Sequence, residues 1–252
     1  GGRCPVAHAP ASAPPRDMLE QLLIARRPDG RPLSDREIQI HLSDMVVAGH
    51  ETTTVAIAWT CYELCRHPTV LGRVVDELDR AGPPRDAAGI AALPYLAAVC
   101  QESLRLHPPL VFLTRAVARP IEVAGVRVPP GLGVSMALPL IHRDPAVFAA
   151  PDQFVPERFL ARTYAPHEYL PFGGGAKRCL GATFATQEMM MVIAGLLARF
   201  ELRLTRPRPV RARARTITIA PAGGVEVTLT PRRVARPAAP PGSWPATARR
   251  GA

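Results

Sequence analysis

The segment between Ser34 and Pro68 limits the possible folds most, because it predicts one helix too long for a small surface element. Ser34 and Glu37 have the spacing of a capping box, in which the serine oxygen and the glutamate carboxylate satisfy the first free amides. Pro68 prevents the helix from continuing. A helix over 35–67 would be roughly 50 Å long at 1.5 Å per residue. We therefore expect a central helix against which other helices pack.

Prolines, glycines and short apolar periods divide the rest of the 252 residues into predicted elements. Apolar residues at helical spacing predict further helices over 17–27, 69–80, 94–106 and 182–200. Residues 85–93 are predicted to form a connecting loop. Shorter runs predict strands over 114–117, 121–123 and 126–128, and a strand pair formed by 216–219 and 225–229. The expected fold class is therefore mainly α with a small β-rich region.

Five cysteines stand at positions 4, 61, 65, 100 and 179. Their number is odd and their spacing fits neither a disulfide framework nor a zinc site, so a reducing, cytoplasmic compartment is the simplest interpretation. Cys61, Cys65 and Cys100 fall within apolar helical patterns and are expected to behave as small buried hydrophobic residues. No apolar run approaches the ~20 residues that span a bilayer, and the first residues do not resemble a signal peptide.

The formal net charge of +10 comes largely from arginines late in the chain. A basic domain raises the hypothesis of nucleic-acid binding. These arginines alternate with Pro, Ala, Val and Thr, without interleaved aromatics or a helix-turn-helix pattern, so no nucleic-acid partner is expected. We interpret residues 232–252 as a disordered basic tail and residues 1–15 as a disordered or cut linker. Positive charge also suits the docking of an acidic partner, a use that Lys177 and Arg178 share.

The segment 172–181 offers one cysteine on a glycine-rich loop that opens a helix. Three successive glycines let the backbone pass close to a flat ligand without side-chain collision. Lys177, Arg178 and the N-terminus of the helix beginning near Leu180 all favour the anionic form of Cys179. The loop therefore presents a thiolate to a metal.

Four motifs together resemble the signature set of the cytochrome P450 family of haem-thiolate monooxygenases. They occur in the family's order and are the segments Ala48-Gly49-His50-Glu51-Thr52-Thr53, Glu102-Ser103-Leu104-Arg105, Pro156-Glu157-Arg158-Phe159 and the loop from Phe172 to Gly181. The resemblance covers roughly the C-terminal half of a typical member. We therefore expect the C-terminal portion of a cytochrome P450 fold, as a fragment or truncated gene product that lacks an N-terminal part.

The resemblance implies that Cys179 is the axial ligand of the iron in haem b. Phe172, Gly175 and Gly181 stand at the family's offsets from this cysteine. One departure is Lys177, because the family commonly has Arg or His two positions before the cysteine. Lysine can pair with a haem propionate as a point charge, although without the planar fork of arginine. Arg115 resembles the arginine that reaches a propionate, and a generic strand arginine is the alternative interpretation.

Two further motifs are assigned supporting roles by the resemblance. Glu102 and Arg105 are three apart on one helix face and can interact; a solvated surface pair is the plain interpretation, whereas the family implies a buried triad with Arg158. Glu51 and Thr52 correspond to the acid and alcohol that deliver protons during oxygen activation. A threonine hydroxyl that bonds a carbonyl one turn back would loosen the helix beside the neighbouring glycine.

The overall function implied is a monooxygenase that inserts one oxygen atom from O2 into an apolar organic substrate. Electrons would come from a ferredoxin- or flavodoxin-type redox partner. Segments that usually line the substrate pocket match the apolar residues Met45, Ala48, Val111, Phe112, Leu113, Ile219 and Ala220. His107, His142 and His167 are interpreted as structural, hydrogen-bonded core residues. The alternative hypothesis is a truncated, non-catalytic remnant that acts at most as a basic interaction surface.

Overall fold

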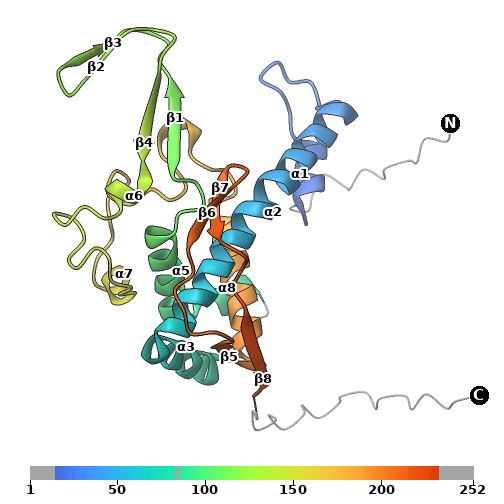
Figure 1. Ribbon diagram of the computed structural model, residues 1–252. Helices are drawn as coiled ribbons and strands as arrows, with labels where there is room; N and C mark the ends of the chain where they lie inside the picture. Colours follow the sequence, from blue (N-terminus) through green and yellow to red (C-terminus); the bar gives the residue numbers. More distant parts are fainter. Residues whose placement is uncertain (1–14, 83, 85, 233–252) are drawn as a thin grey trace, which may run out of the picture.

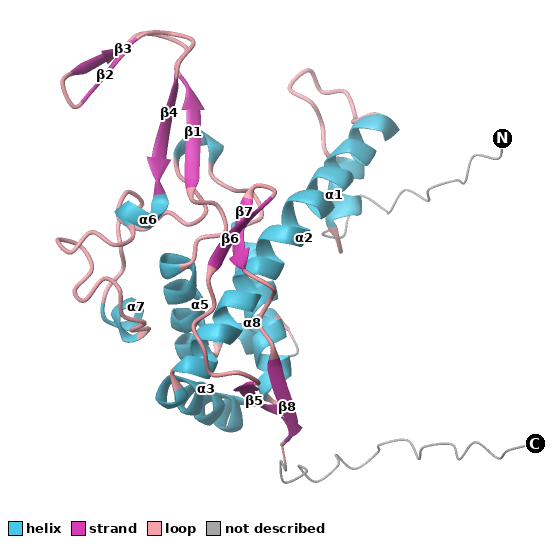
Figure 2. Ribbon diagram, in the orientation of Figure 1, coloured by secondary structure: helices cyan, strands magenta, loops and turns pink. Residues whose placement is uncertain are grey.

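Helices dominate the computed structural model, and the strands form small two-stranded ladders around them (Figures 1 and 2). The structure describes residues 15–82, 84 and 86–232. Its α-helices are α1 (Met18–Ile24), α2 (Asp35–Arg66), α3 (Pro68–Ala81), α4 (Ala87–Ala91), α5 (Pro94–Leu106), α6 (Leu138–Ile141), α7 (Glu157–Ala161) and α8 (Ala182–Leu197). The predicted class, mainly α with a small β-rich region, is confirmed.

The long helix α2 begins at the predicted capping box. The backbone N–H of Glu37 donates to Ser34 Oγ at 3.4 Å, and the Ser34 N–H donates to Glu37 Oε2 at 2.8 Å. At 32 residues the helix is about 48 Å long. Apart from Ile38, its buried residues lie between Thr53 and Leu64. The C-terminal half of α2 therefore packs in the core, while the N-terminal half projects from it beside α1 (Figure 1).

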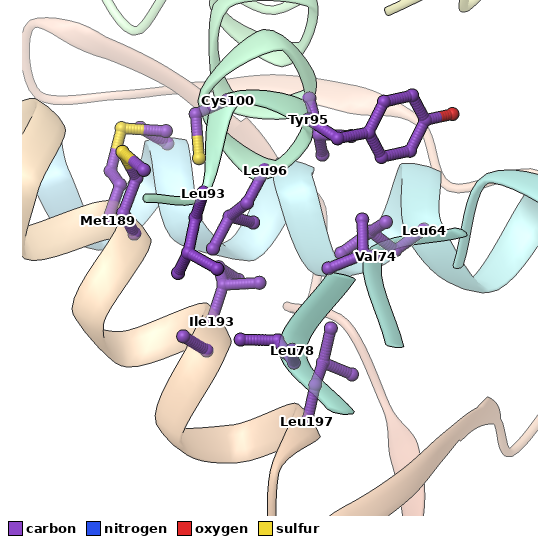
Figure 3. Close-up of a cluster of buried hydrophobic side chains, with 14 of the residues drawn as sticks. Leu64, Val74, Leu78, Leu93, Tyr95, Leu96, Cys100, Met189, Ile193 and Leu197 are labelled. Carbon is purple, nitrogen blue, oxygen red and sulfur yellow. The ribbon is translucent and has the colours of Figure 1, made fainter. Parts of the chain in front are cut away.

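The core lies where α2, α3, α5 and α8 meet. Figure 3 shows its centre, formed by Leu64, Val74, Leu78, Leu93, Tyr95, Leu96, Cys100, Met189, Ile193 and Leu197. Cys61 and Cys65 pack against this cluster. Burial raises the pKa of the Cys61 and Cys100 thiols to about 12, and that of Cys65 to about 11. Cys100 is therefore a small buried residue, as expected, whereas Cys61 and Cys65 are only partly buried.

Two buried polar contacts fix α5 between its neighbours. The Glu77 carboxylate on α3 accepts hydrogen bonds from the backbone N–H groups of Tyr95 and Leu96, at 2.8 and 2.9 Å. These are among the free amides at the start of α5. Thr60 on α2 and Ser103 on α5 are joined through their hydroxyl oxygens, 2.9 Å apart. The position of α5 is thus set by polar contacts as well as by apolar packing.

The four strand pairs in the described part of the chain are all antiparallel. The strand runs predicted at 121–123 and 126–128 are confirmed, whereas the one predicted at 114–117 spans Phe112–Ala116 and pairs with a strand at 133–137. The pairs are β1 (Phe112–Ala116) with β4 (Gly133–Ala137), β2 (Ile121–Val123) with β3 (Val126–Val128), β5 (Phe200–Leu204) with β8 (Val227–Pro231), and β6 (Ala212–Arg215) with β7 (Thr218–Pro221).

The predicted pairing of 216–219 with 225–229 is wrong. β7 pairs instead with β6, through a turn at Thr216 and Ile217, and β8 pairs with β5. Further contacts also use the backbone of Ile219, because its N–H donates to Pro109 O at 2.9 Å and its carbonyl accepts from Trp59 Nε1 at 3.0 Å. The strand is therefore held by β6, α2 and the chain after α5.

Three predicted boundaries also need correction. The helix expected over 17–27 ends at Ile24, because Arg27 N–H bonds the Arg31 carbonyl across a turn at 2.8 Å. The loop expected over 85–93 contains α4, whose first turn is capped by the Asp86 side chain. The helix expected to reach residue 200 ends at Leu197, and β5 begins three residues later.

The predictions for the chain ends fall mostly outside the described residues, since these exclude 1–14 and 233–252. Arg232 is described, and its guanidinium donates to Leu197 O at 3.1 Å and to Asp79 Oδ2 at 2.7 Å. No helix within the described ranges combines the length and apolar character needed to cross a lipid bilayer.

Candidate functional site

The loop that carries Cys179 is a glycine turn followed by a short 3-10 helix over Gly175–Lys177. Gly173 and Gly175 have φ values of 71° and 67°, in the left-handed region that favours glycine. The Cys179 N–H donates to the Phe172 carbonyl at 2.9 Å and closes the loop. Cys179 itself is exposed. The sequence therefore folds so that the thiol is offered at the surface of a tight turn.

Strand β1 packs against this glycine loop. A Cβ on Gly173 would lie 3.4 Å from Leu113 Cδ1 and 4.0 Å from Arg115 Nη2, and the residue is buried. Arg115 Nη1 donates to the Thr114 carbonyl at 3.0 Å. The structure therefore brings Arg115 next to the cysteine loop, where the residue is half-buried.

Lys177, Arg178 and Gly181 all lie at the exposed surface around the cysteine. Gly181 is the N-cap of α8, which begins at Ala182, the start predicted for the helix over 182–200. A Cβ on Gly181 would lie 3.9 Å from Cys179 Sγ, so the sulfur lies close to the start of this helix.

The donor set fits an iron porphyrin, which has a large apolar surface, an axial metal position and two carboxylates. Cys179 supplies one soft sulfur donor, and Arg115 and Lys177 supply cations. Large apolar side chains are exposed on α2, β1 and α8 and beside the cysteine, namely Leu180 (100%), Val47 (76%), Val46 (70%), Phe184 (70%), Phe112 (62%) and Met45 (41%). Within the described ranges, no group of three His, Cys, Asp or Glu side chains could hold a metal ion.

The Glu-x-x-Arg pair is completely buried on α5. Arg105 Nε and Nη2 donate to the two oxygens of Glu102 at 2.7 and 2.8 Å, and both side chains have 0% exposure. Arg158 Nε donates to Glu102 Oε1 at 3.1 Å, and the Val155 N–H donates to the same oxygen at 2.8 Å. The structure therefore brings the three charged residues together in one network, not in a solvated surface pair.

This network reaches the cysteine loop through His142. The Leu170 N–H donates to His142 Nε2 at 3.1 Å, so Nδ1 carries the proton and donates to the Arg105 carbonyl at 3.2 Å. Burial lowers the pKa of His142 to about 4, which keeps the ring neutral. Leu170 stands two residues before Phe172. The buried charges and the loop are thus connected by a single neutral imidazole.

The other two histidines that were predicted to be structural, His107 and His167, differ in their burial. His107 stacks on Trp59, with ring centroids 4.2 Å apart, and its Nε2 lies 2.7 Å from Oε1 of the buried Glu63. It is a structural residue, as expected. His167 is exposed, so its assignment to the core is wrong. The tight turn at 165–168, where Glu168 caps the Ala165 N–H, leaves the intervening side chain in solvent.

Helix α2 carries the candidate acid and alcohol on successive residues. Thr52 Oγ1 donates to the Ala48 carbonyl at 2.7 Å, one turn back. A Cβ on Gly49 would meet no atom within 4 Å, so there is space on this part of the helix. Glu51 is engaged elsewhere, because its carboxylate accepts hydrogen bonds from Thr216 and Thr218 in the β6–β7 hairpin.

Sequence reasoning missed these two threonines. They lie 165 and 167 residues from Glu51, and the predicted strand pair placed the start of the hairpin in a different ladder. No local pattern marks a contact of this kind, since it depends on how β7 packs against α2.

The candidate substrate-pocket residues fall into three groups by their burial. Met45, Ala48 and Phe112 are exposed, and Val111, Leu113 and Ile219 are half-buried. The hydrogen bond from Ile219 N–H to Pro109 O brings β7 beside the chain that leads to Val111. Ala220 is 8% exposed and packs in a cluster with Val55, Trp59 and Tyr62, so its methyl group contacts α2. A pocket role for these residues stays a prediction.

Fold and site together fit a haem-binding protein: an exposed cysteine lies on a glycine loop that adjoins a buried charge network and is followed by an apolar helix. The cytochrome P450 family model matches residues 7–225, so the chain belongs to the cytochrome P450 family. Members of this family bind haem b.

The curated relatives and solved structures agree with this assignment. The chain is 37% identical over 217 residues to a putative cytochrome P450 135B1 of Mycobacterium tuberculosis, covering 86% of this chain and 45% of the relative. It is 37% identical over 227 residues to cytochrome P450 4d2 of Drosophila melanogaster, covering 86% and 44%. The chain therefore spans about half the length of the curated relatives it matches.

Among solved structures, the retinoic acid-bound cyanobacterial CYP120A1 superposes with a TM-score of 0.77 at 32% identity, covering 86% of this chain and 52% of that one. The haem domain of cytochrome P450DA superposes with a TM-score of 0.79 at 29% identity, covering 86% and 50%. The arrangement of helices and ladders described above is thus that of part of a cytochrome P450 fold.

Proposed function

We propose that this chain forms the haem- and oxygen-handling portion of a monooxygenase that inserts one oxygen atom from O2 into an apolar organic substrate. The observation that carries the proposal is the exposed thiol of Cys179 on a closed glycine loop, joined through His142 to the buried network of Glu102, Arg105 and Arg158. When bound, haem b would supply the iron at which O2 is reduced, and a thiolate from Cys179 would favour cleavage of the oxygen–oxygen bond.

The chain's own residues take five roles in this proposal. Cys179 ligates the metal, while Arg115 and Lys177 pair with the propionates. Phe172, Gly175 and Gly181 shape the loop so that a flat ligand can approach it. Glu51 and Thr52 hold and transfer protons on α2. Glu102, Arg105 and Arg158 position the chain that leads to the loop.

The surroundings support an apolar substrate and an acidic electron donor. The side chains assigned to the pocket are all apolar, which suits a hydrophobic organic molecule. On the loop, the exposed Lys177 and Arg178 suit an acidic ferredoxin- or flavodoxin-type partner, since complementary charge speeds encounter. A hollow of about 300 Å³ lies beside Arg178 and is also lined by Gln101 and Thr186.

Spectroscopy of the haem-loaded chain tests this function. The chain is reconstituted with haem, reduced and exposed to carbon monoxide; the expected result is the long-wavelength Soret band of thiolate ligation. Cys179→Ala should abolish the band, whereas Cys61→Ala, which removes a half-buried thiol in α2, should retain it. A nitrogen-ligated spectrum, or no pigment, would contradict the proposal and favour a non-catalytic chain.

A further inference from the structure

The Glu51 carboxylate is fastened to the β6–β7 hairpin by two threonine side chains. Thr216 Oγ1 lies 2.7 Å from both carboxylate oxygens, and Thr218 Oγ1 lies 2.7 Å from Oε1. Thr218 is buried, with 1% exposure. These contacts join the middle of α2 to the turn of a hairpin whose next strand residue, Ile219, is a candidate pocket residue.

Both hydroxyl groups have a second acceptor within reach. Thr216 Oγ1 lies 2.7 Å from the Arg215 carbonyl, and Thr218 Oγ1 lies 3.0 Å from the same oxygen. Each hydroxyl has one proton and two lone pairs. When Glu51 is ionised, both protons can point to its carboxylate. When Glu51 is protonated, its own O–H can donate to a threonine oxygen while the threonine proton turns to Arg215 O.

The hairpin thus accepts either protonation state of Glu51 by rotation of hydroxyl groups alone. No hydrogen-bonding group is lost and no backbone movement is required. Thr216 has φ of 48°, an unfavourable conformation for a β-branched residue. Such a conformation persists only where the surrounding contacts hold it, and the contact with Glu51 is one of those contacts.

We propose that Thr216 and Thr218 are positioning residues that hold Glu51 on the β6–β7 hairpin and set its protonation during the proton delivery proposed above. The inference rests on the proposed function for its catalytic meaning, but the hydrogen bonds themselves do not depend on haem. Because β7 also contributes a candidate pocket residue, contact of a substrate with the hairpin would reach Glu51 through these two side chains.

The groups that face Glu51 lower the pKa of its carboxyl group. The hydroxyls of Thr216 and Thr218 lower the pKa of Glu51, and the neighbouring charges of Arg215 and His50 lower it further, while desolvation opposes them. Loss of the hydroxyls should therefore raise this pKa toward that of an ordinary glutamate.

A carboxyl titration of the full chain tests the inference without haem. The Glu51 side chain is followed by carbon-13 NMR over pH, in the parent chain and in Thr216→Val/Thr218→Val. This double valine variant (the Val pair) keeps the shape of both side chains but lacks the hydroxyl groups, so it should raise the pKa of Glu51. Thr216→Ser/Thr218→Ser retains the hydroxyls and should restore the low value. Thr228→Val, which removes a hydroxyl from β8 that contacts Thr205 at 3.2 Å, should leave it unchanged.

A second measurement uses the haem-loaded chain and the pH profile of O2 consumption with a chemical reductant. The acidic limb should move to higher pH in the Val pair and return in the Ser pair. An unchanged pKa of Glu51 in the Val pair overturns the inference, as does a raised pKa with an unmoved acidic limb. If the double variant does not fold, Thr216→Val alone, at an exposed position, should still raise the pKa. Loss of the thiolate spectrum with an intact shift overturns the proposed function alone.

Discussion

Replacement of Glu102 by glutamine should remove a large part of the stability of the folded chain. The carboxylate accepts four hydrogen bonds, from Arg105 Nε and Nη2, Arg158 Nε and the Val155 N–H, over 2.7 to 3.1 Å. Glutamine keeps the shape of the side chain but loses the charge and one acceptor. The guanidinium groups of Arg105 and Arg158, whose side chains are 0% and 8% exposed, would then be buried without a counter-charge.

Removing one partner from a buried ion pair costs about 3–5 kcal/mol. Since a domain is stable by only about 5–15 kcal/mol, urea unfolding of Glu102→Gln should show a clearly lower midpoint. Glu201→Gln is the matched control, because Glu201 is 55% exposed and lies 3.8 Å from Arg203; its effect should be about 0–1 kcal/mol. A loss below about 1 kcal/mol in Glu102→Gln would refute the reasoning, because the neighbouring backbone carbonyls would then suffice for both arginines.

Two further predictions concern single buried groups. Burial lowers the pKa of His142 to about 4 in the folded chain. Below pH 6.5 the unfolded chain therefore binds a proton at this residue that the folded chain does not bind. The free energy of unfolding should fall as the pH drops from 6.5 to 4. The loss should be roughly 3 kcal/mol, and equal pH dependence of urea unfolding in His142→Asn would contradict it. Thr60→Val leaves the buried Ser103 hydroxyl without its partner and should cost about 1–3 kcal/mol. Adding Ser103→Ala should recover part of that loss in the same assay, and no recovery would count against the contact.

Helix positions were predictable because their signals are local. The capping box at Ser34 and the prolines at 68 and 94 act within one turn of the helix ends that they define. The starts of α2 and α5 are therefore where the sequence predicts them, and α3 begins one residue earlier, at Pro68 itself. The short helix α4 was missed although its Asp86 cap is also local, since five residues give no apolar period to detect.

Strand pairing was predicted less well because it depends on distant partners. The turn at 221–224 forms, and Gly224 N–H donates to Pro221 O at 3.0 Å, but it connects two different ladders instead of closing a hairpin. In the observed pairing with β6, the backbone of Ile219 in β7 is also bonded by Trp59 on α2 and by Pro109 in the chain after α5. Neither residue lies within 100 positions of the strand, so these contacts cannot be predicted from the local sequence around β7.

The site residues were likewise predictable from local motifs, but their distant contacts were not. The buried charges of the site have a physical reason that the motifs alone do not reveal. The chain from 142 to 171 has little regular secondary structure, so its carbonyls lack the partners that a helix or sheet would supply. Arg105 and Arg158 supply them, donating at 2.7 to 3.4 Å to the carbonyls of His142, Ala149, Ala150, Pro151 and Gln153. A pair of apolar residues could fill the same volume, but it would remove these five hydrogen bonds, and of the five oxygens only that of Ala150 would keep a backbone donor, Gln153 N–H at 3.0 Å. Glu102 is then required to neutralise the two guanidinium groups. The ion network thus satisfies an irregular backbone, and that backbone leads directly into the loop that presents Cys179.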